Sequence, residues 1–420
     1  MPKRDIVVGL DVGTTKTAVV IGELYRESQL HILGIGTAPS RGLRGGQVVD
    51  IMRTSEAIDE AALRAERAAG VRLEKVHIGI AGGHLESHSE RAQLSLQRDE
   101  YRVYPRHINA VVRTAASVPL PEHREVVAVI PKTFTVDSMT SIADPRGLAG
   151  RSLEVDAHIV TGAANSMRNL EQCVDVARIG LEGRILQPLA SAEACLTPEQ
   201  RRDGVVLIDI GGGTTDVAVF FEEACWHISV IDIGGEMVTS DISRGLGLPR
   251  AVAEELKIQN SRIDPSAAED DSVIEVPGFD RGAPIEVRRC DLAEVVEARM
   301  EEILVMAKDA IVRSGYYNLL PAGVVLTGGG SQIQGLTNLA ARVMDTSAAL
   351  GRPPAFYGLS EEVRQPEFST GIGLVLAGLK TRVTGSWLQR EPTGVNALIA
   401  RAQGRFRTLL SPKPRWETET

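Results

Sequence analysis

Hydrophobic positions along this chain follow two patterns: short unbroken runs rich in valine and isoleucine, and longer segments whose apolar residues recur at helical spacing. The clearest short run is VVLIDIGGGTTDVAV, at residues 205–219. It predicts a buried strand that ends near Asp209, a turn through three glycines, and a second strand leaving that turn. Taken alone, this pattern is equally typical of an ordinary structural hairpin.

A second copy of the pattern, IVVGLDVGTTKTAVVI, occupies residues 6–21. Aligning Asp11 with Asp209 also aligns a glycine, a threonine and a valine of the two copies. We therefore expect two related half-molecules that face each other across a cleft.

The remaining patterns complete the predicted organisation. Helices are predicted at residues 51–70, 107–116, 166–179, 249–259, 292–315 and 333–344, and strands at 76–81, 126–131, 134–136, 157–162 and just before the glycines of 328–330. The strand at 157–162 is assigned to the first half-molecule, after an inserted domain. Gln187 and Pro188 are predicted as a short strand that leads into an alanine-rich helix, and the acidic residues 264–282 as a loop.

The glycine turns have the chemistry of a phosphate site. Glycines without a Cβ let backbone N–H groups approach an anion closely, and threonine hydroxyls add donors. An aspartate at the strand end can orient a hydrated Mg²⁺. Lys16 in the first turn would add a cation for phosphates, although a solvated turn lysine is an equally good interpretation.

Composition and charge narrow the class of protein. The chain has 420 residues, 43% of them hydrophobic and 24% charged, which is typical of a globular protein with more than one domain. A formal net charge of -9 argues against a general nucleic-acid binder. The four cysteines lack metal-site spacing, and no apolar run approaches the length of a membrane span, so a cytoplasmic protein is predicted.

The end of the chain carries a different pattern. A polar linker is predicted at residues 380–394, followed by an amphipathic helix at 395–410. Its apolar arc and basic residues predict a helix that lies in an anionic membrane surface, and the alternative is a helix packed on the core or on a partner. The residues that would meet the membrane are Val395, Leu398, Ile399, Arg401, Arg405, Phe406, Leu409 and Leu410.

Five segments resemble, in order, the nucleotide motifs of the actin, Hsp70 and sugar-kinase superfamily. They are the first hairpin, residues 185–196, the second hairpin, Gly234 with Gly235, and the glycines of 328–330. Within that superfamily the chain resembles the bacterial cell-division family FtsA over nearly its whole length. The resemblance rests on APSRGLRGG (38–46), VIPKTFTVD (129–137), PRGLAG (145–150), MVTSDI (237–242), LAEVVEARMEE (292–302) and VVLTGGGSQIQGL (324–336).

The resemblance implies an α/β fold of the actin-like class, with two RNase H-like half-molecules around a nucleotide cleft, an inserted 1C-type subdomain and the C-terminal amphipathic helix. It places domain 1A at residues 1–81 and 160–195, domain 1C at 82–159, domain 2A at 196–246 and 302–379, and domain 2B at 247–301.

Motif by motif, the resemblance also implies the site. Asp11 and Asp209 would face Mg²⁺, mostly through water. ATP would be bound by Asp11, Gly13, Thr14, Thr15, Lys16, Asp209, Gly211, Gly212, Gly213, Thr214, Thr215, Gly234, Gly235, Met237, Glu254, Lys257, Gly328, Gly329 and Gly330. Gln187 stands where relatives orient a water, which would support at most slow ATP hydrolysis.

The function that the resemblance implies is an ATP-binding protein that forms actin-like filaments on the cytoplasmic membrane at the division site. It would anchor the tail of the tubulin-like protein FtsZ, with Arg299 as a candidate contact or else a surface ion pair, and it would recruit later division proteins through domain 1C. The alternatives are a cytoplasmic adaptor of type IV pilus assembly similar to PilM, and a small-molecule kinase of the same superfamily.

Overall fold

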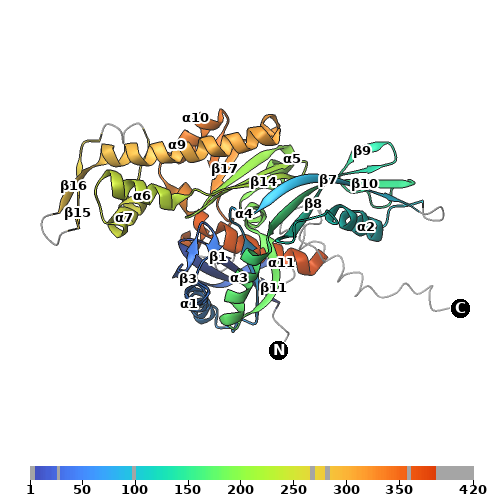
Figure 1. Ribbon diagram of the computed structural model, residues 1–420, viewed down its shortest axis with the longest axis horizontal. Helices are drawn as coiled ribbons and strands as arrows, with labels where there is room; N and C mark the ends of the chain where they lie inside the picture. The colour runs from blue at the N-terminus through green and yellow to red at the C-terminus, as the bar shows by residue number, and fades with distance from the viewer. Residues whose placement is uncertain are drawn as a thin grey trace.

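A computed structural model describes residues 5–25, 29–96, 101–264, 270–279, 284–356 and 361–384. Two mixed α/β half-molecules form the centre of the molecule, and smaller units extend from them in opposite directions (Figure 1). The inserted sheet with helix α2 (Pro105–Ala116) projects to one side, and the hairpin of β15 (Val273–Val276) and β16 (Ile285–Arg288) projects to the other.

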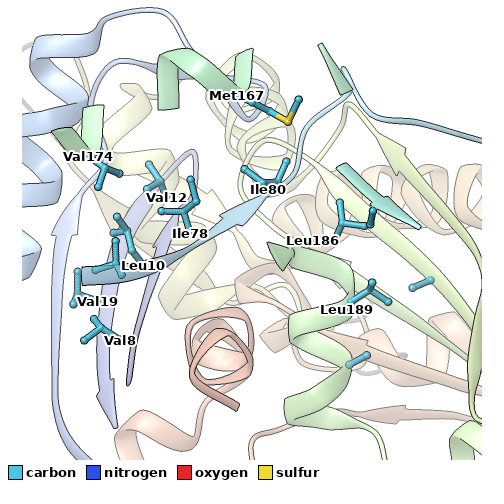
Figure 2. Close-up of a cluster of buried hydrophobic side chains, with 14 of the residues drawn as sticks. Val8, Leu10, Val12, Val19, Ile78, Ile80, Met167, Val174, Leu186 and Leu189 are labelled. Atoms are coloured by element: carbon cyan, nitrogen blue, oxygen red, sulfur yellow. The ribbon is translucent and has the colours of Figure 1, made fainter. Parts of the chain in front are cut away.

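The first half-molecule is a five-stranded sheet in the order β11-β6-β1-β2-β3. Its strands are β1 (Ile6–Val12), β2 (Lys16–Tyr25), β3 (Gln29–Pro39), β6 (Lys75–Ile80) and β11 (Gly180–Leu186). Because strand side chains alternate, Val8, Leu10 and Val12 face one side of the sheet (Figure 2). Helices α1 (Ile51–Ala69) and α3 (Ala164–Val176) cover that side.

The second half-molecule repeats this sheet in the order β14-β13-β12-β17-β18. Its strands are β12 (Val205–Ile210), β13 (Thr215–Phe221), β14 (Ala224–Ile231), β17 (Val324–Thr327) and β18 (Ala348–Leu350). In both sheets the hairpin is antiparallel and its first strand also pairs with a parallel neighbour, β6 or β17. The prediction of two related half-molecules is confirmed.

Four more helices pack on the second half-molecule or extend from it. They are α6 (Gly235–Gly245), α7 (Arg250–Asn260), α9 (Arg289–Ser314) and α10 (Leu336–Met344). The long helix α9 crosses the molecule (Figure 1) and buries Val296, Met300 and Ile303 in the second core. The short helix α5 (Pro198–Asp203) precedes β12.

The inserted unit is a four-stranded sheet of β7 (Glu86–Ser95), β10 (Ser152–Ala163), β8 (Arg124–Val136) and β9 (Met139–Ile142). Two expectations about it are wrong. The strands predicted at 126–131 and 134–136 are the single strand β8, since a register shift in β10 at Ala157 accommodates Pro131. The strand predicted at 157–162 pairs in this inserted sheet as part of β10, rather than in the first half-molecule.

Two further local expectations are also corrected. Gln187 and Pro188 begin helix α4 (Gln187–Cys195) rather than forming a strand, because proline fits the first turn of a helix. The predicted loop at 264–282 contains strand β15, whose partner β16 lies outside the acidic stretch.

The linker is predicted to begin at residue 380, but the preceding helix continues beyond that residue. Helix α11 (Ser369–Thr384) continues through Lys380, which is only 6% exposed and whose Nζ lies 3.3 Å from Glu193 Oε1. Arg382 pairs with Asp5 at 2.6 Å and with Glu182 at 2.9 Å. These carboxylates allow polar residues to extend the helix where the hydrophobic pattern has stopped.

Helices α4 and α11 pack against each other very closely. A Cβ at Gly373 of α11 would lie 1.8 Å from the carbonyl oxygen of Ala190 in α4. No side chain larger than hydrogen fits there without moving one helix. The residues of both helices that meet the cleft are therefore held in fixed positions.

We predict that Gly373→Ala lowers the free energy of unfolding by about 3 kcal/mol, because overpacking forces the two helices apart. Urea unfolding followed by circular dichroism measures the change. Gly245→Ala is the matched control, since its Cβ would make an ordinary 3.6 Å contact with Val295. Equal unfolding midpoints for the two variants would show that α4 and α11 can move apart at little cost in stability.

Candidate functional site

A cavity of about 160 Å³ lies between the turns of the two repeated hairpins. It is lined by residues of both half-molecules and by the ends of α4 and α11. The predicted residues on its wall are Asp11, Gly13, Thr14, Thr15, Lys16, Gln187, Asp209, Gly211, Gly212, Gly213, Thr214, Gly328 and Gly329.

The two hairpin turns have the same geometry and touch each other. Gly13 N donates to Lys16 O at 3.0 Å, and Gly211 N donates to Thr214 O at 2.9 Å. A Cβ at Gly212 would lie 2.5 Å from the side chain of Thr15, so glycine is required for this close approach. Backbone N–H groups and threonine hydroxyls from both halves thus meet at one cavity.

Hydroxyl groups from two helices fix the orientation of Asp209. Sequence analysis did not identify either hydroxyl as part of the site. Ser191 Oγ of α4 donates to Asp209 Oδ2 at 2.6 Å, and Thr370 Oγ1 of α11 donates to the same oxygen at 3.3 Å. Burial raises the pKa of Asp209, whereas these two hydrogen bonds lower it. The carboxylate is therefore oriented before any ligand arrives.

Asp11 is held in the same way by Gln187, whose Nε2 donates to Asp11 Oδ1 at 3.1 Å. Burial raises the pKa of Asp11 to about 7; Lys16 opposes this rise and Asp209 adds to it. A cation bound between these carboxylates would restore their ionised form.

Asp216 is a third buried carboxylate at the cavity, and sequence analysis missed it. Burial raises the pKa of Asp216 well above its ordinary value, and Asp209, Asp11 and Asp232 raise it further. Its Oδ1 is buried and has no hydrogen-bond partner. The hairpin register could have revealed it, since Asp216 stands directly opposite Asp209 and cross-strand partners share a face.

These carboxylates fit a hydrated Mg²⁺. Within the described ranges, no three His, Cys, Asp or Glu side chains gather closely enough to hold an ion directly. Mg²⁺ keeps several of its waters in proteins, so Asp11, Asp209 and Asp216 would hold it mainly through water.

Lys16 is held at the cavity wall rather than solvated. Its Nζ donates to Glu367 O at 3.1 Å, lies 3.6 Å from Glu367 Oε1, and stands 3.9 Å from the centre of the Phe368 ring. Burial lowers the pKa of this ammonium, and Glu367 and Asp11 raise it. Lys16 therefore adds a fixed positive charge to a cavity with three acids.

Several predicted residues lie outside the cavity wall in the described structure. They are Thr215, Gly234, Gly235, Met237, Glu254, Lys257 and Gly330. Thr215 is buried and donates to Ile233 O at 2.7 Å. Gly235 N donates to Gly211 O at 2.8 Å, which places the beginning of α6 beside the second turn.

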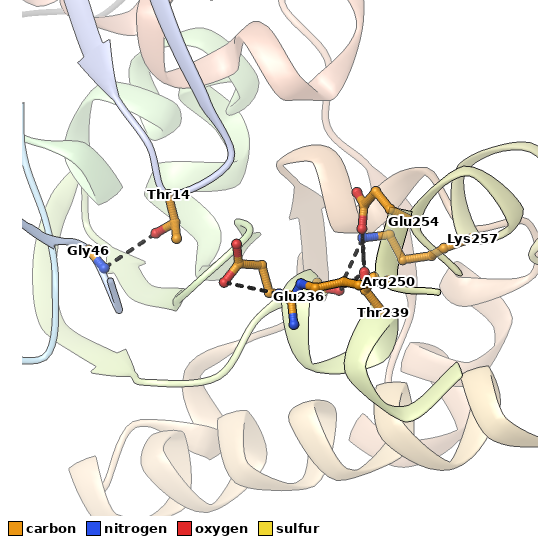
Figure 3. A network of polar contacts seen from close by, with 8 residues as sticks. Thr14, Gly46, Glu236, Thr239, Arg250, Glu254 and Lys257 are labelled. Atoms are coloured by element: carbon orange, nitrogen blue, oxygen red, sulfur yellow. Dashed lines mark hydrogen bonds and ion pairs between the residues drawn. The ribbon is translucent and has the colours of Figure 1, made fainter. Parts of the chain in front are cut away.

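Lys257 and Glu254 belong to a polar network between α6 and α7 (Figure 3). Lys257 Nζ donates to Glu254 Oε2 at 2.8 Å, to Thr239 Oγ1 at 2.9 Å and to Gly235 O at 3.1 Å. This network is half-buried and holds α7 against the beginning of α6. The adenosine contacts of these residues stay a prediction.

Comparison with known proteins decides the family. A family model described as "Cell division protein FtsA" matches residues 206–373, and one described as "SHS2 domain inserted in FTSA" matches residues 82–161. The cell division protein FtsA of Pseudomonas aeruginosa is 39% identical over 380 residues, which cover 90% of this chain and 91% of that protein. This chain belongs to the FtsA family of cell-division proteins. FtsA of Escherichia coli K12 is 33% identical over 92% of this chain and 96% of its own length.

Solved structures confirm the actin-like fold predicted for this FtsA-family chain. A PilM–PilN type IV pilus biogenesis complex aligns with a TM-score of 0.64 at 16% identity, covering 89% of this chain and 98% of that one. MreB5 of Spiroplasma citri, solved with ADP, aligns with a TM-score of 0.51 at 13% identity over 89% and 95%. The likeness to PilM is one of fold, whereas sequence identity supports the FtsA family.

Arg299 lies on α9 and forms ion pairs within the chain. Its Nε lies 2.5 Å from Asp241 Oδ2 of α6, and its Nη1 pairs with Glu302. The Arg299 side chain is about one-fifth exposed. The ion pair that was an alternative interpretation is present, and the contact with FtsZ stays a prediction.

The predicted membrane helix lies outside the described residues. This applies to Val395, Leu398, Ile399, Arg401, Arg405, Phe406, Leu409 and Leu410. Among the helices that the structure describes, none has the length and apolar character needed to cross a bilayer.

We predict that Asp11→Asn stabilises the ligand-free protein at pH 8 by up to about 4 kcal/mol, since each unit of pKa shift is worth about 1.4 kcal/mol. The folded-state pKa of Asp11 is raised from 3.8 to about 7, so its contribution to stability is lost as the pH rises through 7. Thermal unfolding in EDTA at pH 5 and pH 8 measures the effect.

The stability gained by Asp11→Asn should become smaller toward pH 5, where Asp11 is already protonated in the folded state. Asp59→Asn, on the exposed face of α1, is the control that removes a carboxylate away from the cavity. A stability difference that is the same at both pH values would contradict the assigned pKa.

Proposed function

We propose that this FtsA-family protein binds ATP with Mg²⁺ and forms actin-like filaments on the cytoplasmic face of the inner membrane at the division site. There it anchors the FtsZ ring and helps to recruit later division proteins. The observation that carries the proposal is the meeting of two phosphate-type turns and three buried carboxylates at one cavity.

Each part of the cavity has a distinct role in this proposal. The phosphates lie against the two turns, at Gly13 to Lys16 and Gly211 to Thr215, where backbone N–H groups and hydroxyls converge. Asp11 and Asp209 would hold Mg²⁺, mostly through water, and the cation would supply positive charge to the phosphate oxygens. Adenosine lies toward α6 and α7, on Gly234, Gly235, Met237, Glu254 and Lys257, and toward the glycines Gly328, Gly329 and Gly330.

Turnover in this site is slow at most. Gln187 is the residue proposed to orient a water, but an amide cannot accept a proton as a base does. Its Nε2 is already bonded to Asp11. Water orientation without a strong base is typical of slow nucleotide hydrolysis.

We assign the domains by their resemblance to the family. We place domain 1A at residues 1–81 and 160–195, domain 1C at 82–159, domain 2A at 196–246 and 302–379, and domain 2B at 247–301. The end of β10, at residues 160–163, pairs in the inserted sheet and so belongs with domain 1C. Later division proteins and the neighbouring subunit of a filament would meet domain 1C. The acidic tail of FtsZ would meet domain 2B. Arg299 is the candidate cation for that contact, and the tail would compete with Asp241 for the Arg299 side chain.

Membrane attachment is assigned to residues 395–410. Burial of Leu398, Ile399, Phe406 and the leucines at 409 and 410 supplies several kcal/mol, and each nearby arginine adds about 1 kcal/mol on anionic lipid. A single helix of this kind binds reversibly, so a filament that carries many of them attaches more firmly than one subunit.

We predict that Asp209→Asn weakens the Mg²⁺-dependent binding of ATP about tenfold or more, because the substitution removes a charge that faces the cation. Isothermal titration with ATP, in Mg²⁺ and in EDTA, measures the loss. Asp203→Asn, at the exposed end of α5, should bind as the wild type does. Binding that neither EDTA nor Asp209→Asn alters would contradict the proposed cation site.

We predict that the full-length protein floats with anionic vesicles in ATP and that a chain ending at Thr384 sinks. Thr384 is chosen because α11 keeps Lys380 and Arg382 in their ion pairs. Phe406→Glu should abolish flotation by placing a charge in the apolar arc.

Thr408→Glu adds the same charge on the opposite side of the helical wheel and should retain most of the flotation. If the chain ending at Thr384 floats as well as the full chain, the membrane contact lies elsewhere.

A further inference from the structure

The turn that connects the first half-molecule to the inserted sheet forms part of the cavity wall. Residues 81–85 leave β6 and enter β7, and His84 is among the residues that line the cavity. Leu85 N donates to Gly82 O at 3.1 Å, which closes the turn. No sequence motif that we assigned to nucleotide binding includes this histidine.

Gly46 lies between this turn and both phosphate turns. A Cβ at Gly46 would lie 3.1 Å from Gly82 Cα and 3.5 Å from Thr214 Cγ2, and Gly46 N donates to Thr14 Oγ1 at 3.3 Å. Figure 3 shows this bond between Thr14 and Gly46. The turn of His84 is thus packed where the two half-molecules approach each other.

Close packing leaves the turn little freedom. A Cβ at Gly83 would lie 2.1 Å from the carboxylate of Asp232, which follows β14 in the second half-molecule. Gly82 has a φ of +115°, a conformation that side chains other than glycine rarely adopt. Gly82 and Gly83, the two residues that precede His84, therefore cannot be replaced by a larger residue without strain.

The far side of the turn is clamped by Arg124 of β8. Its Nη2 donates to His84 O at 3.2 Å and to Thr161 O at 3.1 Å, and its Nη1 donates to Glu86 Oε1 at 2.9 Å. The Arg124 side chain is only 10% exposed. Because its backbone is fixed from the inserted sheet, the imidazole is presented to the cavity by a rigid support.

The imidazole of His84 has one nitrogen left for a ligand. Its Nδ1 is buried without a hydrogen-bond partner and lies 3.2 Å from the position of a Cβ at Gly162. Because His84 lines the cavity, we assign its other nitrogen, Nε2, to a ligand bound there. Burial and the Arg124 guanidinium lower the pKa of His84, so the ring is neutral at pH 7 and Nε2 can carry its hydrogen.

We propose that His84 binds an oxygen of the terminal phosphate and thereby distinguishes a nucleoside triphosphate from a diphosphate. The inference rests on the proposed binding of ATP. The two hairpin turns hold phosphates by groups that either nucleotide satisfies. His84 reaches the same cavity from a third segment, the turn at residues 81–85. A ligand one phosphate shorter leaves Nε2 without a partner.

The experiment compares the affinities of the full-length protein for ATP, AMP-PNP and ADP, each with Mg²⁺, by isothermal titration. His84→Ala should lower the ratio of triphosphate to diphosphate affinity by about tenfold and leave ADP binding within about twofold, since one hydrogen bond to a charged group is lost. His84→Gln keeps a donor and should recover part of the ratio. His88→Ala, on β7 and outside the cavity wall, is the matched control.

Each outcome separates this inference from the proposed function. A wild-type protein that binds none of the three nucleotides overturns the proposed function. Nucleotide binding with the same affinity ratio in wild type and His84→Ala overturns the role of His84 alone. Equal losses of ATP and ADP affinity in His84→Ala also overturn it, because they indicate a structural role.

Discussion

The burial of three carboxylates in one cavity is the constraint on which the rest of this structure depends. Asp11, Asp209 and Asp216 are each less than a tenth exposed. Asp209 raises the pKa of Asp11, and both of these carboxylates raise the pKa of Asp216. Such a cluster is unfavourable in a ligand-free protein unless hydrogen bonds and cations offset the cost. Gln187, Ser191, Thr370 and Lys16 provide part of that compensation.

Helices α4 and α11 supply most of these groups, so their packing fixes the charge balance of the cavity. Gln187 and Ser191 lie on α4, and Thr370 lies at the beginning of α11. At the other end of the pair, burial opposes the ionisation of Glu193, yet Arg201 and Lys380 hold its pKa at about 2. One end of the helix pair thus donates hydrogen bonds to Asp209, and the other end is held by the buried charges of Glu193, Arg201 and Lys380. The contact at Gly373 lies between them and keeps the two helices at one separation.

The sequence predicts those parts of the site that depend on neighbours along the chain. Each hairpin is encoded within about sixteen residues, which is why its strands, its glycines and its aspartate could be located. Ser191, Thr370 and Glu367 could not be found in this way, because each acts on a residue that only the tertiary fold brings near. Lys380 was assigned to a linker for the same reason, since its partner Glu193 lies 187 residues away.

The arrangement of the cavity favours binding over chemistry. Fast phosphoryl transfer to water needs a group that takes a proton while the phosphate is attacked. In this cavity Gln187 is an amide, Asp209 is engaged by two hydroxyls, and Asp11 is bonded to Gln187. The same hydrogen bonds that help to stabilise Asp11 and Asp209 in a buried position therefore also prevent these two carboxylates from acting as bases. A ligand that brings a cation would relieve the repulsion between the acids, and its binding energy would stabilise the contact between the two half-molecules.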